Sequence, residues 1–311
     1  MTLPPRLLAY ACLGGSMFIV GSYVALSKPL AVVFPVFLLG WLRFGIGGIA
    51  MLRWLRKPST EPPLDRRTRL LIFLEAFLGN FLFTICMVLG VSRSSAVAAG
   101  VIMSAIPAAV ALLSRVVLRE EVRPATWAAV ACGVAGIALL AWTRPHAEVG
   151  VSDADRWLGY ALLFGTVLCE ASYAVIGKRL TAVLSPKRIS AMVNLWGFVL
   201  MLPPGLFIAW SFDFGAVSLP IWGLLVFYSL AASVWTIWLW MTGLRHVPAS
   251  RAGLFTVMLP IGAAAVGVVL LGESFSGLQA LAFAIALLGL LLASWPGRRA
   301  PESTGPARPR Q

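Results

Sequence analysis

The sequence predicts an all-α polytopic membrane protein, with ten transmembrane helices arranged as two inverted five-helix repeats. The first observation is composition: 59% of the 311 residues are apolar, 12% are charged, and the mean hydropathy is +0.89. Soluble domains carry about 25% charged residues. The second and third observations are ten long apolar runs and an internal repeat. Together they exclude a cytosolic enzyme, a disordered chain and a nucleic-acid-binding domain.

Each of the ten apolar runs is long enough to cross a bilayer core, which takes about 20 helical residues. Breaking residues separate the runs, among them Lys28-Pro29, Arg123-Pro124, Ser185-Pro186 and Leu219-Pro220. No segment between the runs could form a soluble domain. The predicted spans are residues 7–27, 33–53, 70–91, 95–115, 125–143, 157–177, 188–210, 219–242, 249–271 and 277–295.

The basic residues predict how the chain is oriented. If the N-terminus is cytoplasmic, 20 of the 25 Lys and Arg residues fall in cytoplasmic segments and four in outer segments, while Arg43 lies inside a span. Cytoplasmic loops of membrane proteins carry such an excess of basic residues. We therefore expect an inner (plasma) membrane protein with both termini in the cytoplasm.

The third observation is the repeat, in which residues 94–142 align without gaps on 247–295 with 13 of 49 positions identical. A second match relates residues 10–28 to 160–178. The shared residues include Ala99-Gly100 with Ala252-Gly253, Pro107 with Pro260, Glu120 with Glu273, Gly136 with Gly289, Trp142 with Trp295, Tyr23 with Tyr173, and Lys28 with Lys178.

A repeat of five spans makes the two halves enter the membrane in opposite directions. We expect one repeat at residues 1–145, a second at 146–297, and a disordered cytoplasmic tail at 298–311, which is rich in Pro and Arg. Inverted repeats are an architecture of transporters, in which two similar halves exchange conformations around a central site. The repeat therefore predicts a transporter.

The repeated stretches resemble the signature of the drug/metabolite transporter superfamily, EamA type. The resemblance rests on Ala99-Gly100, Pro107, Glu120-Glu121 and Gly133/Gly136, on their counterparts in the second half, and on Arg43 in the second span. It implies an exporter of amino acids, metabolites or drugs across the bacterial inner membrane, coupled to protons.

Ionisable residues inside spans are costly and are therefore candidates for function. Glu170 lies near the middle of the sixth span and shares a helical face with Tyr173. It could bind a substrate ammonium or exchange a proton, or it could be a protonated structural carboxyl. Arg43 could bind a carboxylate, although pairing with Glu75 or Glu170 is the favoured expectation. Glu75 is expected to be interfacial or paired.

Other polar and aromatic residues are weaker candidates. Asn80 lies deep in the third span and needs a hydrogen-bond partner, while Ser233 and Thr236 belong to a hydroxyl stripe of the eighth span. That stripe could line an aqueous path or join helices through hydrogen bonds. Trp235 could stack on a substrate or simply pack. Pro107 and Pro260, about midway along equivalent spans, are expected to kink helices beside a central cavity.

The remaining expectations concern partners and alternatives. No nucleotide-binding, zinc or redox motif is present, so neither a cofactor nor a metal is expected. The partners are a small-molecule substrate, the lipid bilayer and protons as the coupling ion, without nucleic acid. Small-residue stripes allow packing within a monomer or between subunits of a homodimer. An importer of the same fold, or less readily a membrane enzyme acting on lipids, remains the alternative.

Overall fold

The computed structural model describes residues 5–57, 61, 63–103, 105–118, 127–128, 131–132, 135, 139, 152–181, 183–244, 255, 258–273 and 276–294. Within these residues the chain is helical, without β-strands. Six helices are long and apolar enough to cross a membrane, beginning at Leu7, Val36, Arg66, Asp153, Pro186 and Leu219. Three shorter apolar helices cover 98–110, 258–269 and 280–289. Most of the fifth predicted span, 125–143, lies outside the described residues.

The helices of the first half have these bounds: α1 Pro5–Val33, α2 Val36–Met51, η1 Leu52–Leu55, α3 Arg66–Ala76, η2 Phe77–Leu82, α4 Phe83–Ser92, α5 Ala96–Met103 and α6 Ile106–Leu118. Those of the second half are α8 Asp153–Leu180, α9 Pro186–Ala209, η4 Phe214–Ala216, α10 Leu219–Leu230, η5 Ala231–Trp235, α11 Thr236–Leu244, α13 Met258–Val269 and α14 Gly277–Ser294. Side-chain caps define the starts of two helices: the side-chain oxygens of Asp65 and Ser152 accept backbone N–H groups at the beginning of α3 and α8.

One sequence expectation about proline requires correction. Lys28-Pro29 does not end the first helix, since α1 continues through Pro29 to Val33. One proline removes a single helical hydrogen bond, and the chain turns only before Pro35. Pro107 is the second residue of α6, just after the interruption between α5 and α6. Pro260 lies in α13, and residues 256–257 before that helix lie outside the described residues. The expected kinks at these prolines therefore stay a prediction.

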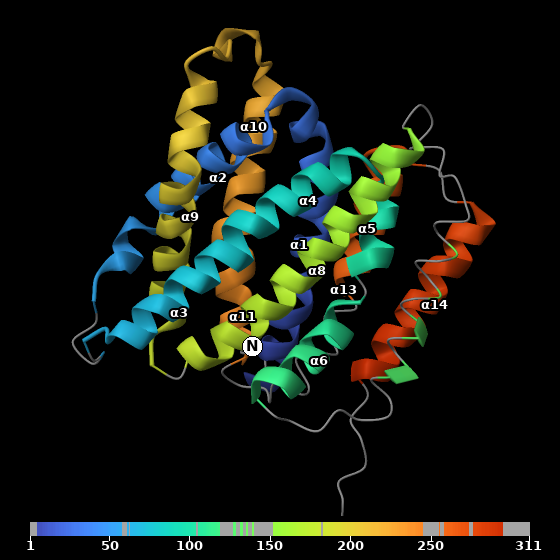
Figure 1. Ribbon diagram of the computed structural model, residues 1–311, viewed down its shortest axis with the longest axis horizontal. Coiled ribbons are helices and arrows are strands. Elements are labelled where there is room, and N and C mark those ends of the chain that lie inside the picture. The colour runs from blue at the N-terminus through green and yellow to red at the C-terminus, as the bar shows by residue number, and fades with distance from the viewer. Residues whose placement is uncertain are drawn as a thin grey trace, which may run out of the picture.

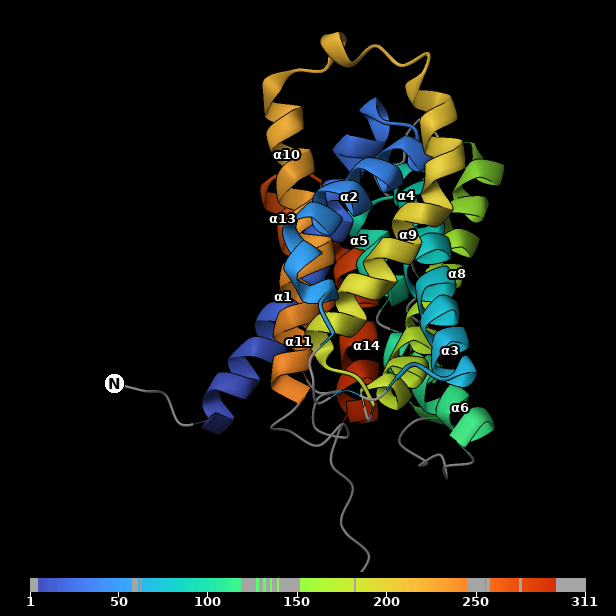
Figure 2. The ribbon, with the colours of Figure 1, turned by 90° about the vertical axis from the view of Figure 1, so that its left-hand side faces the viewer.

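The two halves pack in equivalent pairs (Figures 1 and 2). Helix α1 lies against α13 and α11, and its counterpart α8 lies against α6 and α4. The pairs α2–α9 and α5–α13 join the halves directly. Helices α1 and α8 run in opposite directions through the molecule (Figure 1).

The third helix of each half contains a π-helical segment. These segments are η2, between α3 and α4, and η5, between α10 and α11. They occupy matching positions, because Asn80 of η2 corresponds to Ser233 of η5 at the 153-residue offset of the repeat. π-helical turns inside α-helices are frequent at functional sites.

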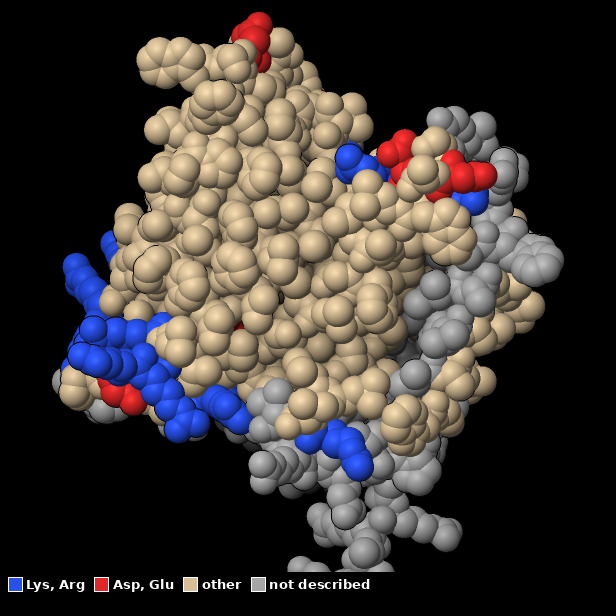
Figure 3. Space-filling view, viewed as in Figure 1, with Lys and Arg blue, Asp and Glu red and all other residues tan. Residues whose placement is uncertain are grey.

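The charged residues lie mostly at the two ends of the bundle (Figure 3). At one end, basic side chains gather around η1, the start of α3 and the start of α9; they include Arg53, Arg56, Lys57, Arg66, Arg67, Arg69 and Lys187. The opposite end carries Asp153 and Asp155 at the start of α8, and Asp213 before α10. The wide band between these ends is apolar, as expected for a surface that faces lipid.

Candidate functional site

A cavity that opens to solvent lies between helices of both halves, and the free space in it and at its opening amounts to about 500 Å³. Helices α1, α2 and α4 and the segment η2 contribute from the first half, and α8, η5 and α11 from the second. The lining residues are Ser16, Met17, Val20, Tyr23, Arg43, Gly79, Asn80, Phe83, Glu170, Tyr173, Ala232, Thr236, Ile237 and Trp240.

Arg43 is the cation of this cavity. Its residue is 2% exposed, and Nη1 donates a hydrogen bond of 2.8 Å to Oγ1 of Thr84 on α4. The guanidinium carbon lies 4.7 Å from the ring centroid of Phe44 and 5.7 Å from that of Tyr228, within the range of cation–π attraction. The Nε atom has no hydrogen-bond partner in the described part of the chain. The head group is therefore held in place but keeps donor capacity.

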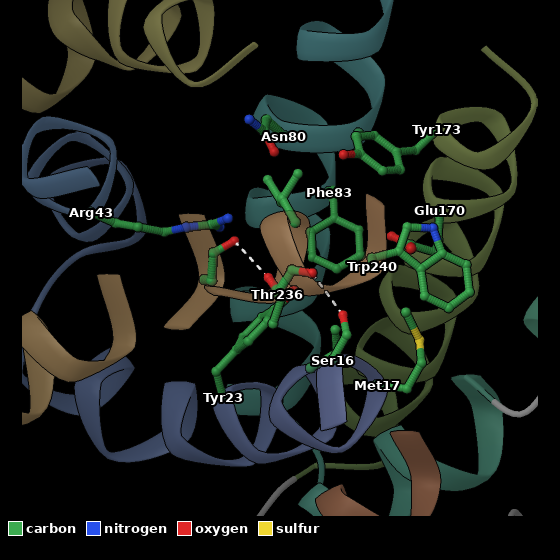
Figure 4. A pocket seen from close by; sticks show the side chains of 14 residues that line it. Ser16, Met17, Tyr23, Arg43, Asn80, Phe83, Glu170, Tyr173, Thr236 and Trp240 are labelled. Atoms are coloured by element: carbon green, nitrogen blue, oxygen red, sulfur yellow. Dashed lines mark hydrogen bonds between the residues drawn. The ribbon is translucent and has the colours of Figure 1, made fainter. Parts of the chain in front are cut away.

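Glu170 is the acid of the cavity. It enters from α8, on the side of the cavity opposite Arg43 (Figure 4). The expected pairing of Arg43 with Glu75 or Glu170 is not found: among the described residues, the side chain of Arg43 bonds to Thr84, and neither acid forms an ion pair. Helix packing holds the guanidinium and the carboxyl apart. The cavity thus presents a guanidinium and a carboxyl that are not paired with each other.

Polar contacts between helices shape the rest of the lining. Ser16 of α1 donates to the backbone oxygen of Thr236 on α11 at 2.7 Å. Asn80 of η2 donates to the backbone oxygen of Val193 on α9 at 3.3 Å, which supplies the partner that the sequence required. Tyr173 and Asn80 come from facing helices and border the cavity together (Figure 4).

The structure brings together five of the predicted site residues, Arg43, Asn80, Glu170, Tyr173 and Thr236, as cavity lining. Three others lie elsewhere. Ser233 is buried, with its side chain against Gly47 of α2. Trp235 is 37% exposed and contacts Phe227 edge to face. Pro260 is not among the lining residues, and the side chain of Pro107 lies outside what the structure describes.

The π-helical segment explains why the hydroxyl stripe of the eighth span divides. The stripe consists of Ser229, Ser233, Thr236 and Trp240. Its spacing of four, three and four residues assumes a regular α-helix, but η5 inserts π-helical turns between Ser229 and Thr236. Ser229 and Ser233 are therefore buried in helix contacts, whereas Thr236 and Trp240 line the cavity.

Sequence reasoning missed all four lining residues of α1, namely Ser16, Met17, Val20 and Tyr23. Apolar and hydroxyl residues are common in membrane helices, so these attract no attention individually. One signal was available: Tyr23 matches Tyr173 at the 150-residue offset, and both tyrosines line the cavity. Recurrence between halves could thus have identified Tyr23.

Comparison with known proteins identifies the class to which this architecture and site belong. The model of the EamA-like transporter family matches residues 7–142 and again 157–295. The chain therefore belongs to the EamA-like transporter family, as the resemblance of the repeated stretches indicated.

Among curated proteins, the chain is similar to three transporters of Bacillus subtilis (strain 168). It is 31% identical over 285 residues to "Uncharacterized transporter YetK", covering 91% of this chain and 86% of the relative. It is 28% identical to "Uncharacterized transporter YwfM", covering 84% of each chain. A solved structure titled "Crystal structure of protein" aligns with a TM-score of 0.64 and 20% identity, over 91% of this chain and 96% of that one, and supports the fold.

Proposed function

We propose that this chain is a secondary transporter that exports a small metabolite, amino acid or drug across the inner membrane by alternating access, with protons as the coupling ion. The observation that carries the proposal is the cavity, which helices of both halves line and which holds the separated Arg43 and Glu170. A central site at the interface of two repeats is the expected place for substrate in such transporters.

The two charged groups suggest the chemistry of the substrate. A guanidinium binds carboxylate well, and a carboxylate binds an ammonium group. Because Arg43 and Glu170 enter from different sides and do not neutralise one another, a zwitterion would pair with both. The apolar and aromatic lining, with Met17, Phe83 and Trp240, leaves room for a side group. We therefore place an amino acid or a similar zwitterion first among candidate substrates.

Alternating access requires halves that exchange roles. The equivalent packing of α1 and α8, their opposite directions and the matching segments η2 and η5 support an inverted repeat of residues 1–145 and 146–297. The basic end of the bundle is assigned to the cytoplasm, together with both termini, because positive residues collect on that side.

A transport experiment with matched variants tests the proposal. Cells overexpressing the wild-type chain should accumulate an external metabolite or resist a toxic analogue, relative to an empty vector. Arg43→Gln and Glu170→Gln should abolish this effect while inserting normally. Trp235→Phe, which changes a residue outside the cavity, serves as the control. Uptake instead of release would establish an importer, and wild-type activity in both cavity variants would contradict the assigned site.

A further inference from the structure

Glu75 is a second membrane-embedded acid, close to the cavity but not part of its lining. The residue is 0% exposed, in the last turn of α3 directly before η2. Neither Oε1 nor Oε2 has a hydrogen-bond partner in the part of the chain that the structure describes. Buried polar groups are nearly always hydrogen-bonded, and an unpaired buried carboxylate is very costly. The site therefore favours the neutral acid.

The carboxyl of Glu75 packs against the backbone of α8. Gly177 leaves space for it, since a Cβ on that residue would be 2.8 Å from Oε1. Ala76, the residue after Glu75, belongs to an apolar cluster whose buried members are Ile72, Ala76, Leu180, Leu184, Ile189 and Val193.

Two titratable groups of α8 lie on the cavity side of Glu75: Tyr173, one turn along α8 from Gly177, and Glu170, which lines the cavity. The segment η2 contributes Asn80, whose amide is engaged by Val193 of α9. The helices that contact α3 carry basic residues near their ends, including Arg179 of α8 and Lys187 and Arg188 of α9. Lys187 lies over the ring of Trp54, and Arg188 is bound to Glu61.

The contact of α3 and η2 with α8 has two successive layers. In the first, Glu75 lies on Gly177; in the second, one turn further along both helices, the Tyr173 ring lies on Gly79, where a Cβ would overlap it. Tyr173 and Gly79 line the cavity, whereas Glu75 and Gly177 do not. The Tyr173 ring is therefore the partition between Glu75 and the cavity that contains Glu170.

We propose that Glu75 is a proton-binding site of its own, separated by Tyr173 from the substrate-facing Glu170. The reaction is only the reversible protonation of a carboxylate, and it needs no other reactant. The π-helical segment η2 carries Gly79, on which the Tyr173 ring rests, and π-helical turns are frequent at functional sites. A role for this proton in driving export rests on the proposed function; the proton binding itself does not.

Infrared difference spectroscopy tests the binding directly, with the proton as the probe. The wild-type protein in lipid nanodiscs is titrated through acidic and alkaline pH, and the carbonyl stretch of protonated carboxyls is recorded. Glu75→Gln should remove one buried-carboxyl band while the band lost in Glu170→Gln remains. Glu61→Gln is the control for an acid outside the membrane spans. An unchanged spectrum in Glu75→Gln would overturn the proposal.

Two further variants keep the test decisive if Glu75→Gln does not insert. Gly177→Ala places a methyl group against Oε1 and should shift the Glu75 band without moving that of Glu170; an unmoved band overturns the assignment.

In heavy water the Glu75 band should exchange more slowly than the Glu170 band, and Tyr173→Ala should remove the difference. Equal exchange rates in the wild type would overturn the partition by Tyr173.

A transport arm separates this inference from the function on which its role rests. Proteoliposomes are assayed with a panel of radiolabelled amino acids, both for exchange and for accumulation driven by a pH gradient. Glu75→Gln should retain exchange and lose pH-driven accumulation; retained accumulation overturns its coupling role. If the wild type transports no member of the panel, the proposed amino-acid substrate fails, while the infrared bands still decide whether Glu75 binds a proton.

Discussion

Lys28 of α1 and Glu273, in the turn after α13, form an ion pair between the two halves of the chain. The Lys28 Nζ atom lies 3.0 Å from Glu273 Oε1, and the same oxygen accepts the backbone N–H of Ala96 at the start of α5. Gly272, with φ of +67°, turns the chain so that Glu273 reaches this position. One side chain thus joins α1, α5 and α13.

Breaking this pair from one side should destabilise the protein. The Glu273 side chain is 3% exposed, and removing the partner of a buried charge costs about 3–5 kcal/mol. Lys28→Met should therefore lower the Tm of the purified protein in detergent, and the double variant with Glu273→Gln should recover much of the loss. Asp153→Asn, which breaks the pair of an exposed Asp153 with Arg156, should cost at most about 1 kcal/mol. Equal effects in Lys28→Met and Asp153→Asn would contradict a structural role for the pair.

Acid should weaken the contact between the loop before α3 and the start of α9. Partial burial acts to raise the pKa of Glu61, but hydrogen bonds from Ser185 and the charge of Arg188 outweigh it and hold the pKa below its usual value. A lowered folded-state pKa stabilises the fold above the unfolded pKa of about 4.3, and this stabilisation is lost as the pH falls through the folded pKa. Thermal unfolding from neutral to acidic pH should show the loss, and Glu61→Gln should flatten the profile. A variant whose pH profile matches the wild type would contradict the linkage.

The contact of α1 with α13 depends on two glycines. A Cβ on Gly21 would overlap the backbone oxygen of Leu259, and one on Gly262 would overlap that of Phe18. Gly21→Ala must push the helices apart, at a cost of about 1–3 kcal/mol for overpacking. Gly15→Ala is the matched control on α1, since no atom lies within 4 Å of its added methyl group. Thermal stability and transport should fall in the first variant alone; similar values for both would reject the close approach.

Pro107 and Pro260 are predicted to act as hinges when the two halves move around the cavity. Pro107→Ala and Pro260→Ala restore a backbone N–H, which would favour a regular, stiffer helix at each position. We expect slower transport with normal membrane insertion, measured as initial rate and as protein in the membrane fraction. Wild-type rates in both variants would remove the hinge role.

Topology can be measured independently of transport. In a cysteine-free background, Thr60→Cys should be protected from a membrane-impermeant label in intact cells, and Gly150→Cys should react. The expectation follows from the excess of basic residues in segments 53–69 and 178–188. Labelling of position 60 but not 150 would reverse the orientation.

Much of the cavity could be predicted from the sequence because its charged residues are costly in a membrane. Arg43 and Glu170 stand out as ionisable residues inside apolar runs, and both line the cavity. Ser233 and Trp235 could not be excluded, because a helical stripe alone does not reveal the π-helical turns of η5 that redirect it. Tyr23 and Ser16 are not ionisable groups of high cost in a membrane, and they were missed.

The sequence by itself determined the membrane class, the repeat and the family signature, since all three depend on composition, length and spacing along the chain. Only the tertiary structure decided which polar groups meet. It joined Arg43 to Thr84 instead of to an acid, and placed Glu75 behind Tyr173. The physical reason is that the rotation of each helix, and its close approach to a neighbour at residues such as Gly79 and Gly177, depend on contacts between segments about 100 residues apart. The local periodicity of the sequence does not encode these contacts.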